Sequence, residues 1–268
     1  RVITSYDALL SQEVYRDTLR PDCILQIGQM VVSKRVQQWV ASMQHIPIIS
    51  VSPTMDYTNP AGNTTLFVQS TPQGLVDALN MEISELHVMA NEVYAEVADE
   101  EFNTADNGYL ATWIDADGVG CKQLDTVARE QELFEGYTIH LLQELLPKNS
   151  QLVVANSMSI RDMDYFWSGN RHSAIIYGNR GVNGIDGTVS TALGIATNGM
   201  PTVLLTGDLT FFHDLNGLAV SKTHPLNVTI IVHNNDGGGI FEYLPQKGTP
   251  YFDYLFSTAQ GLDYSGLA

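Results

Sequence analysis

Positively charged residues are scarce in this sequence. Its 268 residues include 13 Lys and Arg against 30 Asp and Glu, which gives a formal net charge of −17. Because a surface this negative repels phosphate backbones, the composition argues against a nucleic-acid partner. Part of the acidic excess lies in the stretch 87–107, where the run 99–101 is predicted to be a solvated face, since no histidine or turn glycine accompanies it.

Cysteines and long apolar runs are also few. Cys23 and Cys121 lie far apart and lack the spacing of a metal site, so we expect a reducing compartment and no disulfide framework. No apolar run approaches the roughly 18 residues that a membrane span needs. The chain begins with Arg1 and lacks the pattern of a secretory signal, which is typical of a piece of a longer protein. We therefore expect a cytoplasmic location and no membrane span.

The common nucleotide-binding motifs are missing as well. No G-x-x-x-x-G-K-[ST] phosphate loop is present, and no G-x-G-x-x-G follows a predicted strand, which argues against NAD-type dehydrogenases. Strand-like apolar runs alternate instead with helical segments, the pattern of an α/β protein. We predict two Rossmann-like parallel-sheet domains: residues 1–105, incomplete at the start, and residues 131–268, incomplete at the end, joined by a helical connection over 106–130.

Three apolar runs predict strands in the first domain. Residues 23–28 are predicted to be a buried strand, and residues 65–68 a further one. The run 46–51 is a third, although Pro47 confines it to a strand start or a sheet edge. Thr71-Pro72 then begins another helix, because proline suits the first helical turn.

A pair of cations, Lys34 and Arg35, follows the first predicted strand. Ser33 is a candidate N-cap, which places both cations in the first turn of a helix, where the helix dipole disfavours positive charge. From their spacing alone they are either two solvated side chains or part of a basic site.

The second domain is organised around residues 206–241. A buried strand ending at Thr206 precedes Gly207-Asp208, and a helical segment ended by Pro225 leads to a second strand over 228–232. If the two strands are parallel neighbours, both end at the sheet edge where α/β proteins bind ligands.

The residues after these strands suit a metal ion. Asp208 offers a carboxylate oxygen, Asn235 an amide oxygen and the following glycines free carbonyls, which form part of an octahedral Mg²⁺ shell that a diphosphate would complete. Each half taken alone is also compatible with an ordinary turn.

Taken together, the two halves resemble a known motif. Asp208 and Asn235 lie 27 positions apart (235 − 208), the spacing of the Gly-Asp-x and Asn-Asn pattern that binds Mg²⁺ and thiamine diphosphate. With NRGVNGIDGTVSTALGIA, GDLTFFHDLNGL and NNDGGGIF, the chain resembles the 2-succinyl-5-enolpyruvyl-6-hydroxy-3-cyclohexene-1-carboxylate synthase family of menaquinone biosynthesis. The resemblance is strong from about Asn156 to Pro245 and looser before it, and it covers the middle domain and most of the C-terminal domain of the family.

The resemblance implies a function for the parent enzyme. It would be a transferase that uses thiamine diphosphate with Mg²⁺ or Mn²⁺, decarboxylates 2-oxoglutarate and adds the succinyl-semialdehyde carbanion to isochorismate. The full-length parent would be a homodimer or homotetramer. The glutamate that activates the cofactor belongs to a first domain that does not match this chain, so we expect the piece alone to be inactive.

The resemblance also implies roles for individual residues. The metal ligands would be Asp208, Asn235 and the carbonyl of Gly237. The cofactor would contact Gly207, Thr210, Asn234, Gly238, Ile240, Phe241 and Ile185, the last as a prop for its bent conformation. The substrate carboxylates would meet Ser157, Arg161, Arg180, Lys34 and Arg35.

The residues alone leave alternatives open. Ser157 and Arg161 also fit a helix N-cap and a surface arginine, Arg180 a surface side chain, and the apolar residues core packing. His213 and His233 are interpreted as structural, since neither has a second histidine or cysteine at metal spacing.

Two other functions stay open. A 2-oxoacid decarboxylase or an acetolactate synthase would keep the Mg²⁺ motif but would not need so many substrate-facing arginines. In a non-catalytic α/β interaction domain, Asp208 and the asparagines would only cap turns.

Overall fold

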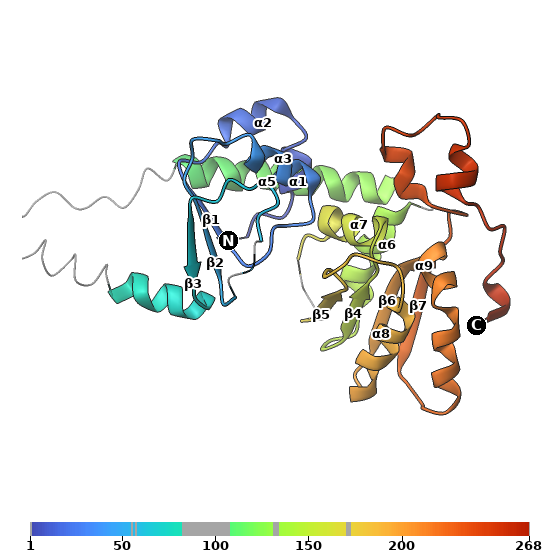
Figure 1. Ribbon diagram of the computed structural model, residues 1–268. Coiled ribbons are helices and arrows are strands. Elements are labelled where there is room, and N and C mark those ends of the chain that lie inside the picture. Colours follow the sequence, from blue (N-terminus) through green and yellow to red (C-terminus); the bar gives the residue numbers. More distant parts are fainter. Residues whose placement is uncertain are drawn as a thin grey trace, which may run out of the picture. The chain divides into compact units, whose positions relative to one another are not determined.

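The computed structural model describes residues 2–54, 56, 58–81, 108–130, 134–169 and 173–267. The chain divides into two compact units, Arg1–Gly120 and Cys121–Ala268, each with its own parallel sheet (Figure 1). The predicted fold class is therefore confirmed. The division falls inside helix α5 (Gly108–Glu130), and the predicted domain limits stay a prediction. The acidic stretch predicted over 87–107 lies outside the described residues.

The first unit contains a three-stranded parallel sheet in the order β1-β2-β3. Its strands are β1 (Ile24–Ile27), β2 (Ile48–Ser52) and β3 (Leu66–Gln69). Its helices are α1 (Tyr6–Leu9), α2 (Glu13–Thr18), α3 (Lys34–Ala41), a helix over 72–81 and the first part of α5.

Several predictions for this unit are confirmed, among them the strand near 65–68 and the helix after Thr71, and one is wrong. Pro47 stands directly before the central strand β2, so it marks a strand start. Ser33 caps α3, because its hydroxyl accepts the N–H of Val36 at 3.1 Å. However, β1 is not a buried strand: Leu25 and Ile27 are 48% and 49% exposed, because β1 lies at the edge of the sheet.

The second unit contains a four-stranded parallel sheet in the order β5-β4-β6-β7. Its strands are β4 (Gln151–Val154), β5 (Ile175–Gly178), β6 (Thr202–Gly207) and β7 (Val228–His233). Its α-helices are α6 (Glu135–Leu145), α7 (Met158–Phe166), α8 (Thr188–Ile195) and α9 (Asp208–His213). Shorter helical turns are η1 (Ala196–Asn198), η2 (Leu215–Lys222), η3 (Gly239–Tyr243), η4 (Asp253–Ser257) and η5 (Ser265–Leu267).

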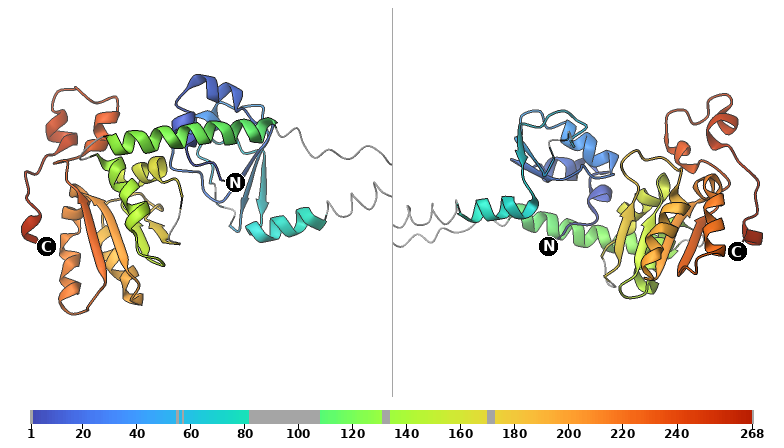
Figure 2. Two further views of the ribbon diagram at one scale, coloured as in Figure 1. Left: turned by 180° about the vertical axis from the view of Figure 1, so that it is seen from behind. Right: turned by 60° about the horizontal axis from the view of Figure 1, so that its bottom comes forward.

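Helices cover both faces of this sheet, as the two views of Figure 2 show. Alternate residues of a strand point to opposite faces, so Leu152 and Leu205 pack with α6 and α7, whereas Val153 and Leu204 pack with α8. Both central strands are buried along almost their whole length. Strands covered on both faces are continuous apolar runs, which is why the sequence pattern revealed β4 and β6 so clearly.

The expected pairing of β6 with β7 is confirmed, with Gly207 opposite His233 at the carboxyl end. The helical connection between them is the short α9 followed by the 3₁₀-helical η2, rather than one continuous helix. His233 is the last residue of β7, which is only half-buried because it is an edge strand.

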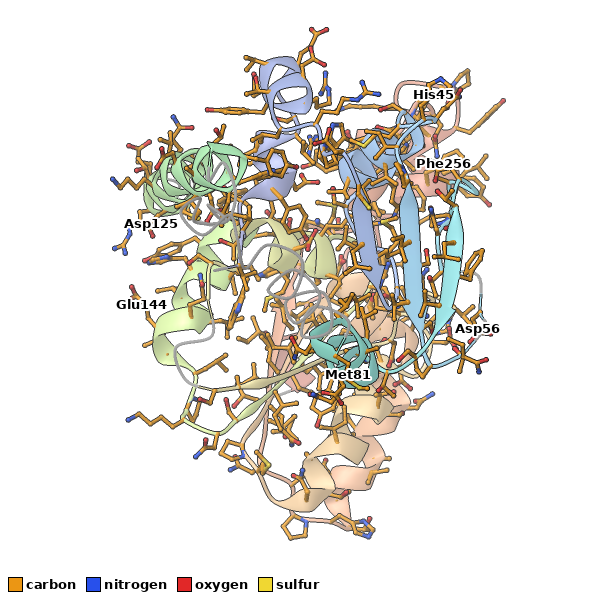
Figure 3. All side chains as sticks on the ribbon, turned by 90° about the vertical axis from the view of Figure 1, so that its left-hand side faces the viewer. His45, Asp56, Met81, Asp125, Glu144 and Phe256 are labelled. Carbon is orange, nitrogen blue, oxygen red and sulfur yellow. The ribbon has the colours of Figure 1, made fainter. Side chains whose placement is uncertain are left out.

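A charged network joins the second part of α5 to α6. Asp125 and Glu144, labelled in Figure 3, both lie near Arg129 and His140. His140 lies 3.1 Å from Asp125 through Nδ1 and 3.3 Å from Glu144 through Nε2. Among the described residues, no helix is long and apolar enough to cross a membrane.

Candidate functional site

The carboxyl ends of β4 and β6 form a topological switch point. The two strands are neighbours, but the chain leaves β4 toward α7 on one face and leaves β6 toward α9, which packs with α8 on the other. Such divergence opens a crevice above the sheet, where open α/β sheets bind ligands.

A pocket of about 330 Å³ opens at this edge of the second unit. It is lined by most of the site residues predicted in this unit: Ser157, Arg161, Arg180, Ile185, Gly207, Asp208, Thr210, Asn235, Gly237, Gly238, Ile240 and Phe241. The structure thus brings together residues from β4, β5, β6 and β7 ends that are dispersed along the sequence. Their individual roles stay predictions.

Asp208 is the buried anion of this pocket. Its side chain is 3% exposed, and its carboxylate accepts the N–H of Leu209 and the N–H of Gly237, each at 2.8 Å. In the described part of the chain, no Lys, Arg or His side chain forms an ion pair with it. A buried carboxylate without a cationic partner among the described residues suits a bound cation.

The glycine turn after β7 approaches Asp208 closely because it lacks side chains. Gly237 has a φ of 145°, a conformation that glycine alone adopts readily. The Gly238 N–H donates to the carbonyl of Ser257 at 2.7 Å, and a Cβ at Gly237 would overlap that same oxygen. Residues 237–238 are therefore held between Asp208 and η4.

Alanine at position 237 is expected to destabilise the second unit by roughly 1–3 kcal/mol, because it combines backbone strain with a steric clash. The Gly181→Ala variant is the matched control, since a Cβ there meets nothing within 4 Å. Chemical unfolding of both variants measures the difference. Equal stabilities would show that the turn is not constrained as described.

Asn234 and Asp236 flank Asn235 but do not line the pocket. Asn234 accepts the N–H of Asp236 at 3.2 Å. The carboxylate of Asp236 accepts the backbone N–H groups of Gln260 and Gly261 at 3.0 and 2.7 Å. In the asparagine run, Asn235 is therefore the side chain that the structure places at the pocket.

Two arginines give the other side of the pocket a positive charge. Arg161 donates to the carbonyl of Ser157 at 2.6 Å, and Arg180 donates to Oδ1 of Asn156 at 2.7 Å. Burial and the nearby Arg161 lower the pKa of Arg180. Two cations close together favour an anionic ligand, and guanidinium groups bind carboxylates in a bidentate manner.

Ser157 stands at the start of α7 with a φ of 68°, which is unusual for a residue other than glycine. Its side chain caps none of the described N–H groups of the helix. A strained conformation at a pocket edge is typical of functional positions.

Lys34 and Arg35 belong to the first unit, where both are exposed at the start of α3. Arg35 forms an ion pair with Asp7, which also accepts a hydrogen bond from Ser33. Arg35 thus has a structural partner of its own, and a substrate role for either cation stays a prediction.

Three titratable side chains near the pocket were not predicted as site residues. Glu135, the first residue of α6, and His233, whose Nε2 is buried without a hydrogen-bond partner among the described residues, both line the pocket. Burial lowers the pKa of His233, with Glu135 acting in the opposite direction. Burial and the charge of Glu135 raise the pKa of Asp162 to about 7, and Arg161 acts against them. The sequence showed only an acidic first helical turn at Glu135, which is too common to indicate a site.

Comparison with known proteins agrees with this geometry. Residues 157–268 match the family described as "Thiamine pyrophosphate enzyme, C-terminal TPP binding domain". The second unit therefore carries the cofactor-binding domain of a thiamine diphosphate enzyme, with the pocket at its expected sheet edge.

The whole chain is also similar to three synthases of one name. It is 50% identical over 268 residues to the 2-succinyl-5-enolpyruvyl-6-hydroxy-3-cyclohexene-1-carboxylate synthase of Lactococcus lactis subsp. lactis, covering 100% of this chain and 44% of the relative. It is 48% identical over 268 residues to that of L. lactis subsp. cremoris, covering 100% and 45%, and 41% identical over 266 residues to that of Desulfitobacterium hafniense, covering 99% and 44%. The chain is thus similar to this synthase family over almost its whole length, and it spans a little under half the length of these relatives.

Proposed function

We propose that this chain is the part of a 2-succinyl-5-enolpyruvyl-6-hydroxy-3-cyclohexene-1-carboxylate synthase that holds the diphosphate and the metal ion of thiamine diphosphate. The observation that carries the proposal is the buried carboxylate of Asp208, hydrogen bonded to Gly237 at the switch point of a thiamine diphosphate-binding domain. The pocket beside it contains two arginines, which suits carboxylate substrates.

The donor set fits a hard divalent cation. The described residues contain no group of three or more His, Cys, Asp or Glu side chains suited to a metal ion. Mg²⁺, however, commonly binds through one or two carboxylates together with phosphate oxygens and water. One carboxylate, one amide oxygen and one backbone carbonyl, from Asp208, Asn235 and Gly237, therefore suffice when a diphosphate completes the shell.

The remaining residues divide between cofactor and substrates in this proposal. Mg²⁺ or Mn²⁺ would be held by the three ligands above, and the cofactor would contact Ile185, Gly207, Thr210, Gly238, Ile240 and Phe241 in the pocket and Asn234 beside it. The substrate carboxylates are bound by Ser157, Arg161, Arg180, Lys34 and Arg35. When bound, thiamine diphosphate supplies the electron sink that permits decarboxylation of a 2-oxo acid. The protein neutralises carboxylates and orients both substrates.

In this proposal 2-oxoglutarate is the donor and isochorismate the acceptor, in menaquinone biosynthesis, and the full-length enzyme is a homodimer or homotetramer. The name shared by the relatives and the arginine-lined side of the pocket support this assignment. We infer that the chain alone does not catalyse the reaction, since it matches less than half of each relative.

Calorimetric titration of the chain with thiamine diphosphate tests the cofactor site. Binding is expected in the presence of Mg²⁺ and is expected to weaken on the order of 100-fold or more with EDTA, because the carboxylate of Asp208 would repel a diphosphate unless a cation lay between them. Binding of equal strength with and without metal would overturn the assignment. If this chain binds the cofactor too weakly to measure, the same comparison with and without metal is made in the full-length enzyme. If the full-length enzyme decarboxylated pyruvate in preference to 2-oxoglutarate, the result would favour a different thiamine diphosphate enzyme.

A further inference from the structure

Asn156 is a buried side chain that connects two loops of the site. It follows β4 directly after Ala155 and is 2% exposed. Its amide nitrogen donates to the carbonyls of Asn179 and Gly184, at 2.9 and 2.6 Å, and its amide oxygen accepts from Arg180 at 2.7 Å. All three bonds reach the loop between β5 and α8, so one side chain ties both ends of that loop to the neighbouring strand.

The loop that Asn156 holds carries two pocket residues, Arg180 and Ile185. Much of the loop is solvent-exposed, and Val182 at its tip is 95% exposed. A loop with so little burial has few contacts of its own to restrict its conformations. The bond to Gly184 fixes the backbone immediately before Ile185, and the bond to the guanidinium restricts the side chain of Arg180.

An amide suits this position better than a carboxylate for two physical reasons. First, an asparagine has both a donor and an acceptor, whereas an ionised aspartate has no donor for the two carbonyls. Second, a neutral oxygen orients the guanidinium without neutralising it, so that Arg180 keeps its charge for a ligand. Arg180 lies near Arg161, and the pair attracts an anion only while both charges remain available.

We propose that Asn156 is a positioning residue, which orients Arg180 toward a substrate carboxylate and fixes Ile185 beside the cofactor. Asn156 does not line the pocket itself and therefore acts through the loop. The proposal rests on the function proposed above and adds the residue that holds the carboxylate-binding arginine in place.

A double-mutant cycle in the full-length enzyme tests this role. The variants are Asn156→Ala, Arg180→Ala and the two combined, and the readouts are KM for 2-oxoglutarate, KM for isochorismate and kcat. A residue that orients a metal ligand commonly contributes about 10- to 100-fold to affinity or activity, and we expect a similar factor for a residue that orients a substrate-binding arginine. Asn156→Ala should therefore raise KM about 10- to 100-fold for the same substrate whose KM is raised by Arg180→Ala. If Asn156 acts through Arg180, the double variant is expected to show a KM within about threefold of that of Arg180→Ala. Multiplicative effects of the two substitutions would overturn the proposal.

The Asn156→Asp variant covers the case in which the alanine variant does not fold. It keeps the shape and the acceptor but pairs Arg180 with a negative charge, so KM for the same substrate is expected to rise at least tenfold at pH 8. An unchanged KM would overturn the proposal. The Asn149→Gly variant is the matched control, because Asn149 lies in an exposed turn with a φ of 56° that glycine adopts freely.

Binding of thiamine diphosphate separates the two proposals. If the wild-type enzyme binds the cofactor with Mg²⁺ but the cycle shows independent effects, only the role of Asn156 is wrong. If the wild-type enzyme does not bind the cofactor, the proposed function itself is wrong.

Discussion

Replacing Asp208 with alanine is expected to weaken Mg²⁺-dependent binding of thiamine diphosphate at least 100-fold. Losing a group that merely orients a metal ligand already costs about 10- to 100-fold in affinity, and Asp208 is the proposed anionic ligand itself. Titration calorimetry of the chain or of the full-length enzyme measures the change. If the full-length Asp208→Ala variant still decarboxylated 2-oxoglutarate, the cofactor assignment would be wrong.

A pair of isosteric variants separates the role of Asp208 from a general effect of charge. Asp208→Asn and Asp236→Asn each remove one negative charge from the same region, but only Asp208 lines the pocket. The Asp236 carboxylate accepts two backbone N–H groups, and an amide oxygen can accept them as well. We therefore expect Asp236→Asn to bind the cofactor within about threefold of the wild type and Asp208→Asn to lose most of its affinity.

Asp208→Asn is also expected to lower stability. The two oxygens of the Asp208 carboxylate each accept one backbone N–H, from Leu209 and from Gly237, whereas an asparagine has only one oxygen, so its NH₂ group would face a buried donor. Asp208→Asn should therefore unfold at a lower temperature than the wild type when no cofactor is added. It should also lose the rise in unfolding temperature that cofactor and Mg²⁺ give the wild type, because only a ligand that binds the native state stabilises it.

Replacing Asp162 with asparagine is expected to stabilise the second unit at pH 8. Its side chain is 9% exposed, one carboxylate oxygen has no hydrogen-bond partner among the described residues, and its pKa is raised to about 7 from 3.8. The folded state therefore binds a proton that the unfolded state has released, and stability falls as pH rises from about 4 through 7. At roughly 1.4 kcal/mol for each pKa unit, the loss is on the order of 4 kcal/mol as an upper bound.

Urea unfolding at pH 5 and pH 8 measures this effect. The wild type should lose stability between the two values, whereas Asp162→Asn cannot ionise and should change much less. Asp253→Asn is the control, since Asp253 is an exposed aspartate. Parallel losses in the wild type and in Asp162→Asn would show that Asp162 is not the group responsible.

The sheet edge of the site could be predicted from the sequence because local patterns encode it. Apolar runs that stop at Gly207-Asp208 and at Asn235 show where two strands end, and glycines mark the close backbone approach. The burial of β1 was predicted wrongly because burial depends on strand order, and a run of four to six residues does not encode whether its strand is central or at an edge.

The positions that sequence reasoning missed depend on partners distant in the chain. Asn156 bonds to residues 23 to 28 positions away, and no periodicity indicates such a pairing. Glu135 reaches the pocket from the start of α6, where an acidic residue is common for reasons of helix stability alone. For both, the signal lies in three-dimensional proximity rather than in composition or spacing.

The strand order of the second unit also bears on how the site is assembled during translation. The arginine side depends on β4, α7 and β5, which are consecutive in the chain and adjacent in the sheet. The acidic side depends on β6 and β7, which join the opposite edge of β4 only after α8 has been synthesised. Because segments emerge from the ribosome in order, the elements that carry Arg161 and Arg180 can fold before those that carry Asp208. The nascent chain can therefore present an anion-binding surface before it can hold a metal ion.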